Sequence, residues 1–123
     1  MSVTILVIDD SLMVRQQVSR ALTGAGFSML EACDGLEAHQ KLAGGADVRL
    51  IVCDVNMPRM NGIEFLEKMS ANGLSIPVVM LTTEGQPELI QRAKALGAKG
   101  WIVKPFKPEM LVAAAKKLTA AAA

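Results

Sequence analysis

The sequence predicts an α/β fold in which a five-stranded parallel sheet is covered by helices on both faces. Two patterns lead to this prediction. Short apolar runs alternate five times along the chain with segments of helical length and helical spacing. These runs are continuous rather than alternating with polar residues, which is typical of strands buried on both faces of a parallel sheet. Strict strand–helix alternation then favours crossover connections that return each strand to the same sheet.

The first half of the chain contains three of the strands. Residues 3–8 (VTILVI) are short, continuous and rich in β-branched side chains, so they predict a buried strand. Residues 12–24 predict a helix, because apolar residues recur at helical spacing, Ser11 is a suitable cap and glycines follow. The other elements of this half are a weaker strand at 27–33, a short helix from Asp34 or Gly35 to 44–45, and a strand at 48–53.

The second half continues the same alternation. A helix is expected at 61–69, and a strand at 76–81 tolerates Pro77 because it lies near the strand's start. Pro87 and Pro108 each suit the first position of a helix, where a missing N–H costs nothing. The remaining elements are a helix from 87 that ends before Gly97, a strand at 100–103, a helix from 108 through 118, and an alanine tail read as a fraying helix end.

Length and composition narrow the class of protein. A chain of 123 residues suggests one domain. No apolar run approaches the ~18 residues that span a membrane, and no basic segment precedes the first apolar run, so we expect a cytoplasmic protein without a secretory signal. A net charge of +1 and only four aromatic residues, three Phe and one Trp, argue against nucleic-acid and membrane partners. Cys33 and Cys53 lie in apolar runs and are expected to be reduced, and no zinc-binding spacing is present.

Polar side chains follow four of the predicted strands at the points where they end. Asp9-Asp10 follows the first strand, Asp54 the third, Thr82-Thr83-Glu84 the fourth and Lys104 the fifth. The carboxyl ends of parallel strands lie at one edge of the sheet, where open α/β sheets bind ligands. A single aspartate at a strand end is commonly a turn or cap residue, but complementary chemistry at four ends favours one functional site.

These residue types together favour phosphoryl transfer. At ~4 Å and an effective dielectric constant near 20, each pair of carboxylates repels by about 4 kcal/mol, so the cluster needs a cation. Hard oxygen ligands without histidine or thiolate favour Mg²⁺. Lys104 and Thr82 supply a positive charge and a hydroxyl for a phosphoryl group. Asp54 stands alone and is the predicted nucleophile, whereas the Asp9-Asp10 pair is better suited to hold the metal.

Four segments carry a resemblance to a known family. In order and spacing, VIDDS, CDVNMPRMNG, MLTTE and GWIVKPF resemble the receiver domain of two-component response regulators, most closely its stand-alone chemotaxis members. The similarity covers residues 3–118. It implies a doubly wound, flavodoxin-like sheet in the order 2-1-3-4-5, and a monomeric single receiver domain over 1–123 without an output domain.

The resemblance also implies a role for each site residue. Asp54 would be the phosphoacceptor and a metal ligand, and Asp10 would bind Mg²⁺ directly while Asp9 acts through water. The remaining roles fall to Asn56 (metal binding through its backbone carbonyl), Thr82 (switch hydroxyl), Lys104 (partner of the phosphoryl group, before a cis bond to Pro105), Trp101 (switch aromatic) and Asn56 with Glu84 (phosphoryl lifetime). Three residues depart from the family pattern: Trp101 replaces Tyr or Phe, Thr83 replaces Ala, and His39 replaces an apolar residue, which we expect to be exposed or at an edge.

The implied function is a signalling switch rather than an enzyme. A histidine kinase would phosphorylate Asp54, and the face made by the fourth helix, fifth strand and fifth helix would bind a target, such as a flagellar motor switch. One alternative is a phosphorelay intermediate that passes its phosphoryl group to a histidine phosphotransfer protein. Two alternatives come from other classes. An FMN binder is disfavoured because IDDSLMV is acidic and lacks glycines, and a Mg²⁺-dependent phosphatase because residues 54–58 offer no second acid.

Overall fold

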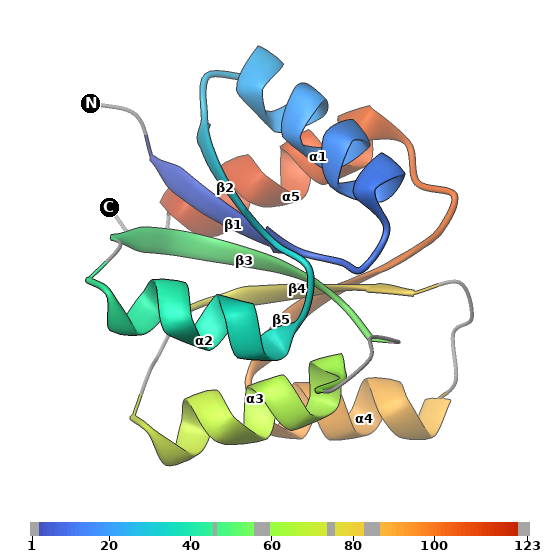
Figure 1. Ribbon diagram of the computed structural model, residues 1–123. Helices are drawn as coiled ribbons and strands as arrows, with labels where there is room; N and C mark the ends of the chain where they lie inside the picture. Colours follow the sequence, from blue (N-terminus) through green and yellow to red (C-terminus); the bar gives the residue numbers. More distant parts are fainter. Residues whose placement is uncertain (1–2, 46, 56–59, 74–75, 83–86, 121–123) are drawn as a thin grey trace.

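A five-stranded parallel sheet forms the centre of the molecule (Figure 1). The computed structural model describes residues 3–45, 47–55, 60–73, 76–82 and 87–120. The strands lie in the order β2-β1-β3-β4-β5, which confirms the predicted topology. The strands are β1 (Thr4–Ile8), β2 (Ser28–Ala32), β3 (Val48–Asp54), β4 (Val78–Thr82) and β5 (Ala98–Val103). The helices are α1 (Leu12–Gly24), α2 (Gly35–Ala43), α3 (Gly62–Ala71), α4 (Pro87–Ala95) and α5 (Pro108–Ala120).

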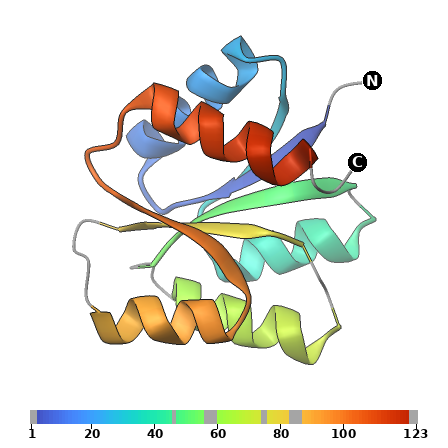
Figure 2. The ribbon, with the colours of Figure 1, turned by 180° about the vertical axis from the view of Figure 1, so that it is seen from behind.

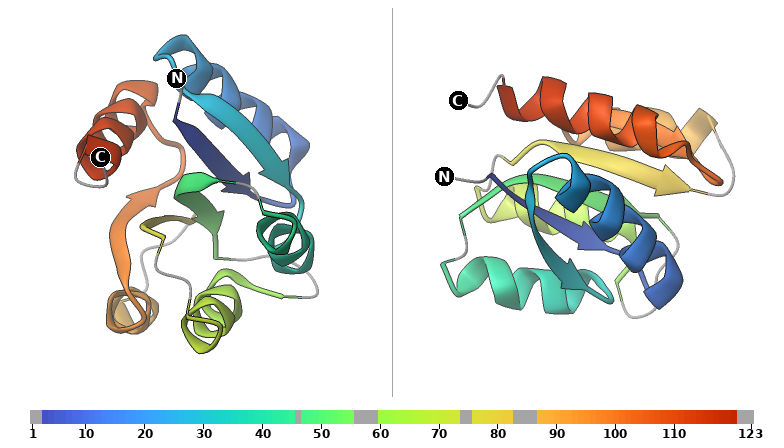
Figure 3. Two further views of the ribbon diagram at one scale, coloured as in Figure 1. Left: turned by 90° about the vertical axis from the view of Figure 1, so that its left-hand side faces the viewer. Right: turned by 90° about the horizontal axis from the view of Figure 1, so that it is seen from above.

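The helices cover the two faces of the sheet unequally. Helices α1 and α5 lie side by side on one face, and α2, α3 and α4 cover the other (Figures 1, 2 and 3). Successive residues of β1 point to opposite faces: Ile5 and Val7 join the core under α1 and α5, while Leu6 and Ile8 join the core under α2, α3 and α4. Strand β1 is therefore buried on both sides, which explains its continuous apolar sequence.

Side-chain caps explain where three of the helices begin. The Ser11 hydroxyl accepts from the Val14 amide at 3.3 Å, and the Asp34 carboxylate accepts from the Glu37 amide at 2.9 Å. Asn61 and Glu64 form a reciprocal capping box at the start of α3. Asn61, predicted as the first helical residue, is thus the N-cap. These caps satisfy backbone N–H groups that have no partner within the helix.

The predicted strand boundaries differ from the observed ones mainly in β4 and β5. Strand β4 begins at Val78 rather than 76, because Pro77 has no N–H for the ladder. Strand β5 begins at Ala98, two residues earlier than predicted, because Ala98 pairs with Val78. Such pairing depends on the neighbouring strand and is not visible in local sequence. Among the described residues, no helix combines the length and apolarity needed to cross a bilayer.

Candidate functional site

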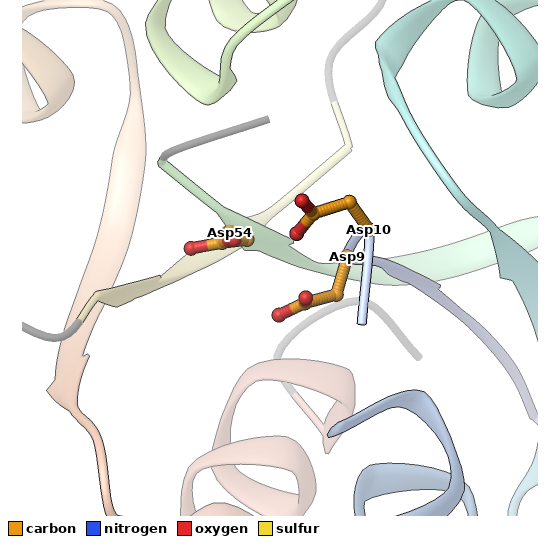
Figure 4. A group of neighbouring side chains, drawn as sticks. All are labelled: Asp9, Asp10 and Asp54. Atoms are coloured by element: carbon orange, nitrogen blue, oxygen red, sulfur yellow. The ribbon is translucent and has the colours of Figure 1, made fainter. Parts of the chain in front are cut away.

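Three aspartates converge at the carboxyl edge of the sheet. Asp54 is the last residue of β3, and Asp9 and Asp10 directly follow β1. The two strands are parallel neighbours in which Ile8 is opposite Cys53, so the next residues along each strand are brought together. Each aspartate offers a carboxylate oxygen, and the three oxygens lie within 4.8 Å of one another. Figure 4 shows the three carboxylates pointing to the same side. The predicted convergence is therefore present.

Lys104 places a positive charge between two of these carboxylates. Its Nζ lies 2.8 Å from Asp9 Oδ2 and 3.4 Å from Asp54 Oδ1. Asp9 and Asp54 are buried, whereas Asp10 is exposed. Lys104 follows the end of β5, and its amide donates to the Thr82 carbonyl at 2.6 Å, which ties it to the end of β4. The peptide bond between Lys104 and Pro105 is cis, the isomer that the resemblance implies.

The surroundings of Lys104 keep its ammonium charged. Burial acts to lower the pKa of Lys104, but the hydrogen bond to Asp9 and the charges of Asp54 and Asp9 outweigh it and raise the pKa above its usual value. A raised lysine pKa means that the interaction is present at neutral pH and is lost only as the pH rises through that value. Lys104 is therefore a permanent cation of the site under physiological conditions.

Asp9 is held by hydrogen bonds to every one of its polar atoms. Its amide donates to the Ala32 carbonyl at 3.1 Å, and its two carboxylate oxygens accept from the Ser11 amide at 2.9 Å and from Lys104. Its carbonyl oxygen accepts from Arg15 Nη1 at 2.6 Å. Arg15 was not among the predicted site residues, because its contact with Asp9 depends on how α1 turns back over the strand end.

A glycine at the start of α3 allows the helix to approach the site closely. The Gly62 amide donates to the Val55 carbonyl at 2.9 Å. A β-carbon on Gly62 would lie 2.5 Å from the Asp54 carbonyl oxygen and 2.7 Å from Met80 Cε. Any other residue would therefore push α3 away from the end of β3.

The donor set fits a hard divalent cation. Three carboxylates within 4.8 Å of one another supply only oxygen ligands, which Mg²⁺ prefers. Two of the three are buried, and the exposure of Asp10 leaves a side of the cluster open to solvent. Such an opening suits Mg²⁺, which keeps several waters and binds through one or two carboxylates together with a phosphate.

Other predicted site residues are only partly described. Thr82 is the last residue of β4 and is buried. Trp101 is opposite Met80 on β5, is half-buried, and packs against the core under α2, α3 and α4. Asn56, Thr83 and Glu84 lie outside the described residues. Their predicted roles in metal binding and phosphoryl lifetime stay predictions.

His39 is more enclosed than the sequence suggested. Its ring packs against Phe65 with ring centroids 4.6 Å apart, and its Nε2 is buried without a hydrogen-bond partner among the described residues. The prediction that His39 is exposed is therefore wrong, because the apolar face of α2 meets α3 at this position. Burial and the nearby charge of Lys68 lower the pKa of His39.

The cysteines match the prediction of reduced thiols. Cys53 is buried and Cys33 is half-buried, and neither forms a disulfide. Burial, followed by the charges of Asp54 and Asp9, raises the pKa of Cys53 well above its usual value. Cys53 is therefore a neutral core thiol and does not add a thiolate to the acidic site.

The fold and the acidic site define a class of signalling domain, and comparison with known proteins agrees. Residues 5–116 match the family model described as the response regulator receiver domain. The chain belongs to this family. The chemotaxis protein CheY1 of Helicobacter pylori is 41% identical over 111 residues, covering 87% of this chain and 89% of that protein. The chemotaxis protein CheY of Treponema pallidum is 37% identical over 106 residues, covering 83% of this chain and 72% of that protein.

Solved structures show the same architecture. The chemotaxis protein CheY4 of Vibrio cholerae superposes with a TM-score of 0.88 at 42% identity, covering 96% of this chain and 99% of that one. A receiver domain from Francisella superposes with a TM-score of 0.91 at 24% identity, covering 99% of this chain and all of that one, a likeness that concerns the fold alone. The flavodoxin-like topology is thus shared, whereas the FMN-binding alternative has no support from these relatives.

Proposed function

We propose that this response regulator is a phosphorylation-driven switch in which Asp54 accepts a phosphoryl group from a histidine kinase. The observation that carries the proposal is the convergence of Asp9, Asp10 and Asp54 beside the Lys104 ammonium. Carboxylates, a lysine and a nearby threonine are the parts that phosphoryl transfer to a carboxylate requires. Membership of the receiver family supports the same assignment.

The acidic residues would hold Mg²⁺ in the active state. Asp10 and Asp54 are the proposed direct ligands, with Asp9 acting through water and Asn56 through its backbone carbonyl. When bound, the cation would neutralise negative charge on the transferred group and on the carboxylates. Lys104 already hydrogen-bonds Asp9, which keeps one buried carboxylate compensated while Asp10 remains accessible.

Phosphoryl transfer would use the Asp54 carboxylate as the nucleophile. One carboxylate oxygen attacks the phosphorus of phosphohistidine, a P–O bond forms, and the P–N bond to the imidazole breaks. The imidazole leaves as the neutral ring after taking up a proton from solvent. Lys104 lies 3.4 Å from Asp54 Oδ1 and is therefore within reach of a phosphoryl oxygen on that side chain.

The phosphoryl group would then change the ends of β4 and β5. Its negative charge would attract the Thr82 hydroxyl and Lys104, and Thr82 already shares a backbone hydrogen bond with Lys104. Movement of these strand ends would change the packing of Trp101 on β5, which lies against the core beside α4. The output face would be α4, β5 and α5, where Val103 and Met110 are exposed apolar residues suited to a protein partner.

The pathway is proposed from the relatives. Curated relatives that are 37–41% identical to this chain are named as chemotaxis proteins, so we assign this chain to chemotaxis, with a flagellar motor switch as the target of its phosphorylated form. We also propose that the aspartyl phosphate hydrolyses without a phosphatase, with Asn56 and Glu84 setting its lifetime. A phosphorylated form that persists for hours in isolation would contradict this second part.

Replacement of the nucleophile tests the proposal. Asp54→Asn should take up no label from radiolabelled acetyl phosphate or from a phosphorylated kinase in the presence of Mg²⁺. Asp47→Asn is the matched control, because Asp47 is exposed and precedes β3 at the opposite end of the strand, where its ion pair is with Arg49. The control should be labelled like the wild type. Labelling of Asp54→Asn to the wild-type extent would overturn the proposal.

A further inference from the structure

We infer that Arg15 is a positioning residue of the acidic site, which fixes the peptide between Asp9 and Asp10 and through it the placement of both carboxylates. The inference deepens the proposed function and rests on it. Arg15 lies on α1, outside the strand ends that deliver the acidic and basic side chains. It is expected to act through Asp9 rather than on the phosphoryl group itself.

The guanidinium of Arg15 bridges two structural elements. Its Nη1 donates to the Asp9 carbonyl at 2.6 Å, and its Nε donates to Glu31 Oε1 on β2 at 3.1 Å. The Arg15 side chain is only 15% exposed. Ser19, one turn further along α1, also lies at hydrogen-bond distance from Glu31, with its hydroxyl 3.5 Å from Oε2. The arginine is therefore oriented by Glu31 while it holds Asp9.

The orientation of the Asp9 carbonyl determines the direction in which the chain enters Asp10. This carbonyl belongs to the Asp9–Asp10 peptide plane, and Asp9 is fully buried. The amide and carboxylate of Asp9 are bound by Ala32, Ser11 and Lys104, so Arg15 supplies the remaining restraint. With the plane fixed, Asp10 leaves the backbone in one direction and its carboxylate stays within 4.8 Å of Asp54.

The position of Arg15 is otherwise unfavourable for a cation. Arg15 is the fourth residue of α1, and the first turn of that helix contains no acidic residue. The amino end of a helix carries partial positive charge, so it favours acidic rather than basic side chains. Glu31 compensates the charge of Arg15 across the gap to β2. The two contacts use separate N–H donors of one planar guanidinium, one toward Asp9 and one toward Glu31, and lysine has no such pair of fixed donors.

The experiment measures Mg²⁺ binding to Arg15→Met, with the fluorescence of the single tryptophan and the amide signals of Asp9, Asp10 and Ser11 as readouts. The dissociation constant for Mg²⁺ should rise about ten-fold, as it does when groups that orient metal ligands are removed. At saturating Mg²⁺ the rate of labelling by acetyl phosphate should return to within about two-fold of wild type, because Arg15 touches no reacting atom. Without metal, the Ser11 amide should exchange faster with solvent.

Two further variants separate positioning from loss of folding. Arg15→Lys keeps the charge but cannot bridge Asp9 and Glu31 together, so its affinity for Mg²⁺ should be intermediate. Glu31→Gln should weaken binding less than Arg15→Met, and the double variant should resemble Arg15→Met, since Glu31 acts through Arg15. Arg49→Met is the control, because it removes an exposed arginine paired with Asp47 away from the site; its affinity should be that of wild type.

The outcomes distinguish the two claims. If the wild type binds Mg²⁺ and is labelled on Asp54, but Arg15→Met binds Mg²⁺ no more weakly than Arg49→Met, the role of Arg15 is overturned and the proposed function stands. A wild type that neither binds Mg²⁺ nor accepts a phosphoryl group overturns the proposed function, and the role of Arg15 falls with it.

Discussion

At the scale of single residues, the site places charged side chains in buried positions, which binding of a charged ligand explains. Asp9 and Asp54 are both buried, and the Lys104 ammonium compensates their charge from 2.8 Å and 3.4 Å. Buried ion pairs contribute little net stability compared with apolar packing, because desolvation offsets most of the attraction. The cluster is therefore better explained by a ligand that it binds than by the stability of the fold.

The sequence located these charged residues but not the residues that support them. Asp9, Asp10, Asp54 and Lys104 could be placed together because each one ends or follows a strand of a parallel sheet. Arg15 could not, since its importance lies in a contact across the fold with the Asp9 carbonyl. Gly62 belongs to the CDVNMPRMNG segment of the resemblance, but its close approach to the Asp54 carbonyl was not predicted. No pattern within α1 or α3 signals those distances.

The close approach of α3 gives a prediction for Gly62. Gly62→Ala should lower the free energy of unfolding by about 1–3 kcal/mol, the usual cost of overpacking, because the new methyl group would meet the Asp54 carbonyl. Urea denaturation measures this. Gly24→Ala is the matched control, since no atom lies within 4 Å of a β-carbon there. Equal effects of the two substitutions would contradict the close-packing explanation.

The environment of His39 predicts a dependence of stability on pH. Because the native state lowers the pKa of His39 below 6.5, the unfolded chain binds this proton more readily. Stability should therefore fall as the pH drops below 6.5, and His39→Leu should lose this part of the pH dependence. The chain has a single histidine, so one imidazole NMR signal reports the midpoint directly. A midpoint above 6.5 would show that His39 is stabilised in its charged form.

At the scale of the elements, caps and strand ends determine where the site residues stand. Helix α1 begins at Leu12, with Ser11 as its cap directly after Asp10, and α3 begins at Gly62, with Asn61 as its cap. The sequence predicted α1 with the observed bounds because its signals are local: a serine before the apolar spacing and glycines after it. The starts of β4 and β5 were misplaced because strand bounds follow pairing with neighbours.

The capping box of α3 is open to a direct test. Asn61→Ala should lower the free energy of unfolding by about 1 kcal/mol, because the Glu64 amide loses its acceptor at the start of the helix. Thermal or urea denaturation measures the change. Asn61→Asp retains a capping oxygen and should be close to wild type. A similar loss in both variants would mean that the cap itself is not responsible.

At the scale of the whole molecule, the alternation of five strands and five helices predicted the parallel sheet with helices on both faces, whereas the strand order came from the family resemblance. Strands β1, β3 and β4 are largely buried on both faces, the edge strands β2 and β5 are only partly buried, and α1 to α4 each connect one strand to the next in the same sheet. This architecture brings residues as distant as Asp9 and Lys104 into contact. The cluster they form carries like charges, so the molecule should be less stable without a cation than its packing alone would allow.

This repulsion predicts opposite effects of one substitution with and without metal. In EDTA, Asp10→Asn should unfold at a higher temperature than wild type, because one negative charge is removed from the cluster. Mg²⁺ should raise the unfolding temperature of wild type by mass action and raise that of Asp10→Asn much less. Differential scanning calorimetry compares the two, with Asp47→Asn as a variant that loses an exposed charge away from the site. If Mg²⁺ raises the unfolding temperature of Asp10→Asn as much as that of wild type, Asp10 is not a ligand of the metal site.

The most direct test is to locate the phosphoryl group chemically. The protein is incubated with acetyl phosphate and Mg²⁺, the acyl phosphate is reduced with borohydride, and the product is mapped by peptide mass spectrometry. Reduction of an aspartyl phosphate converts that residue to homoserine. We predict homoserine at position 54 alone. Homoserine at position 9 or 10, or no conversion while Mg²⁺ is bound, would contradict the assignment of Asp54 as the phosphoacceptor.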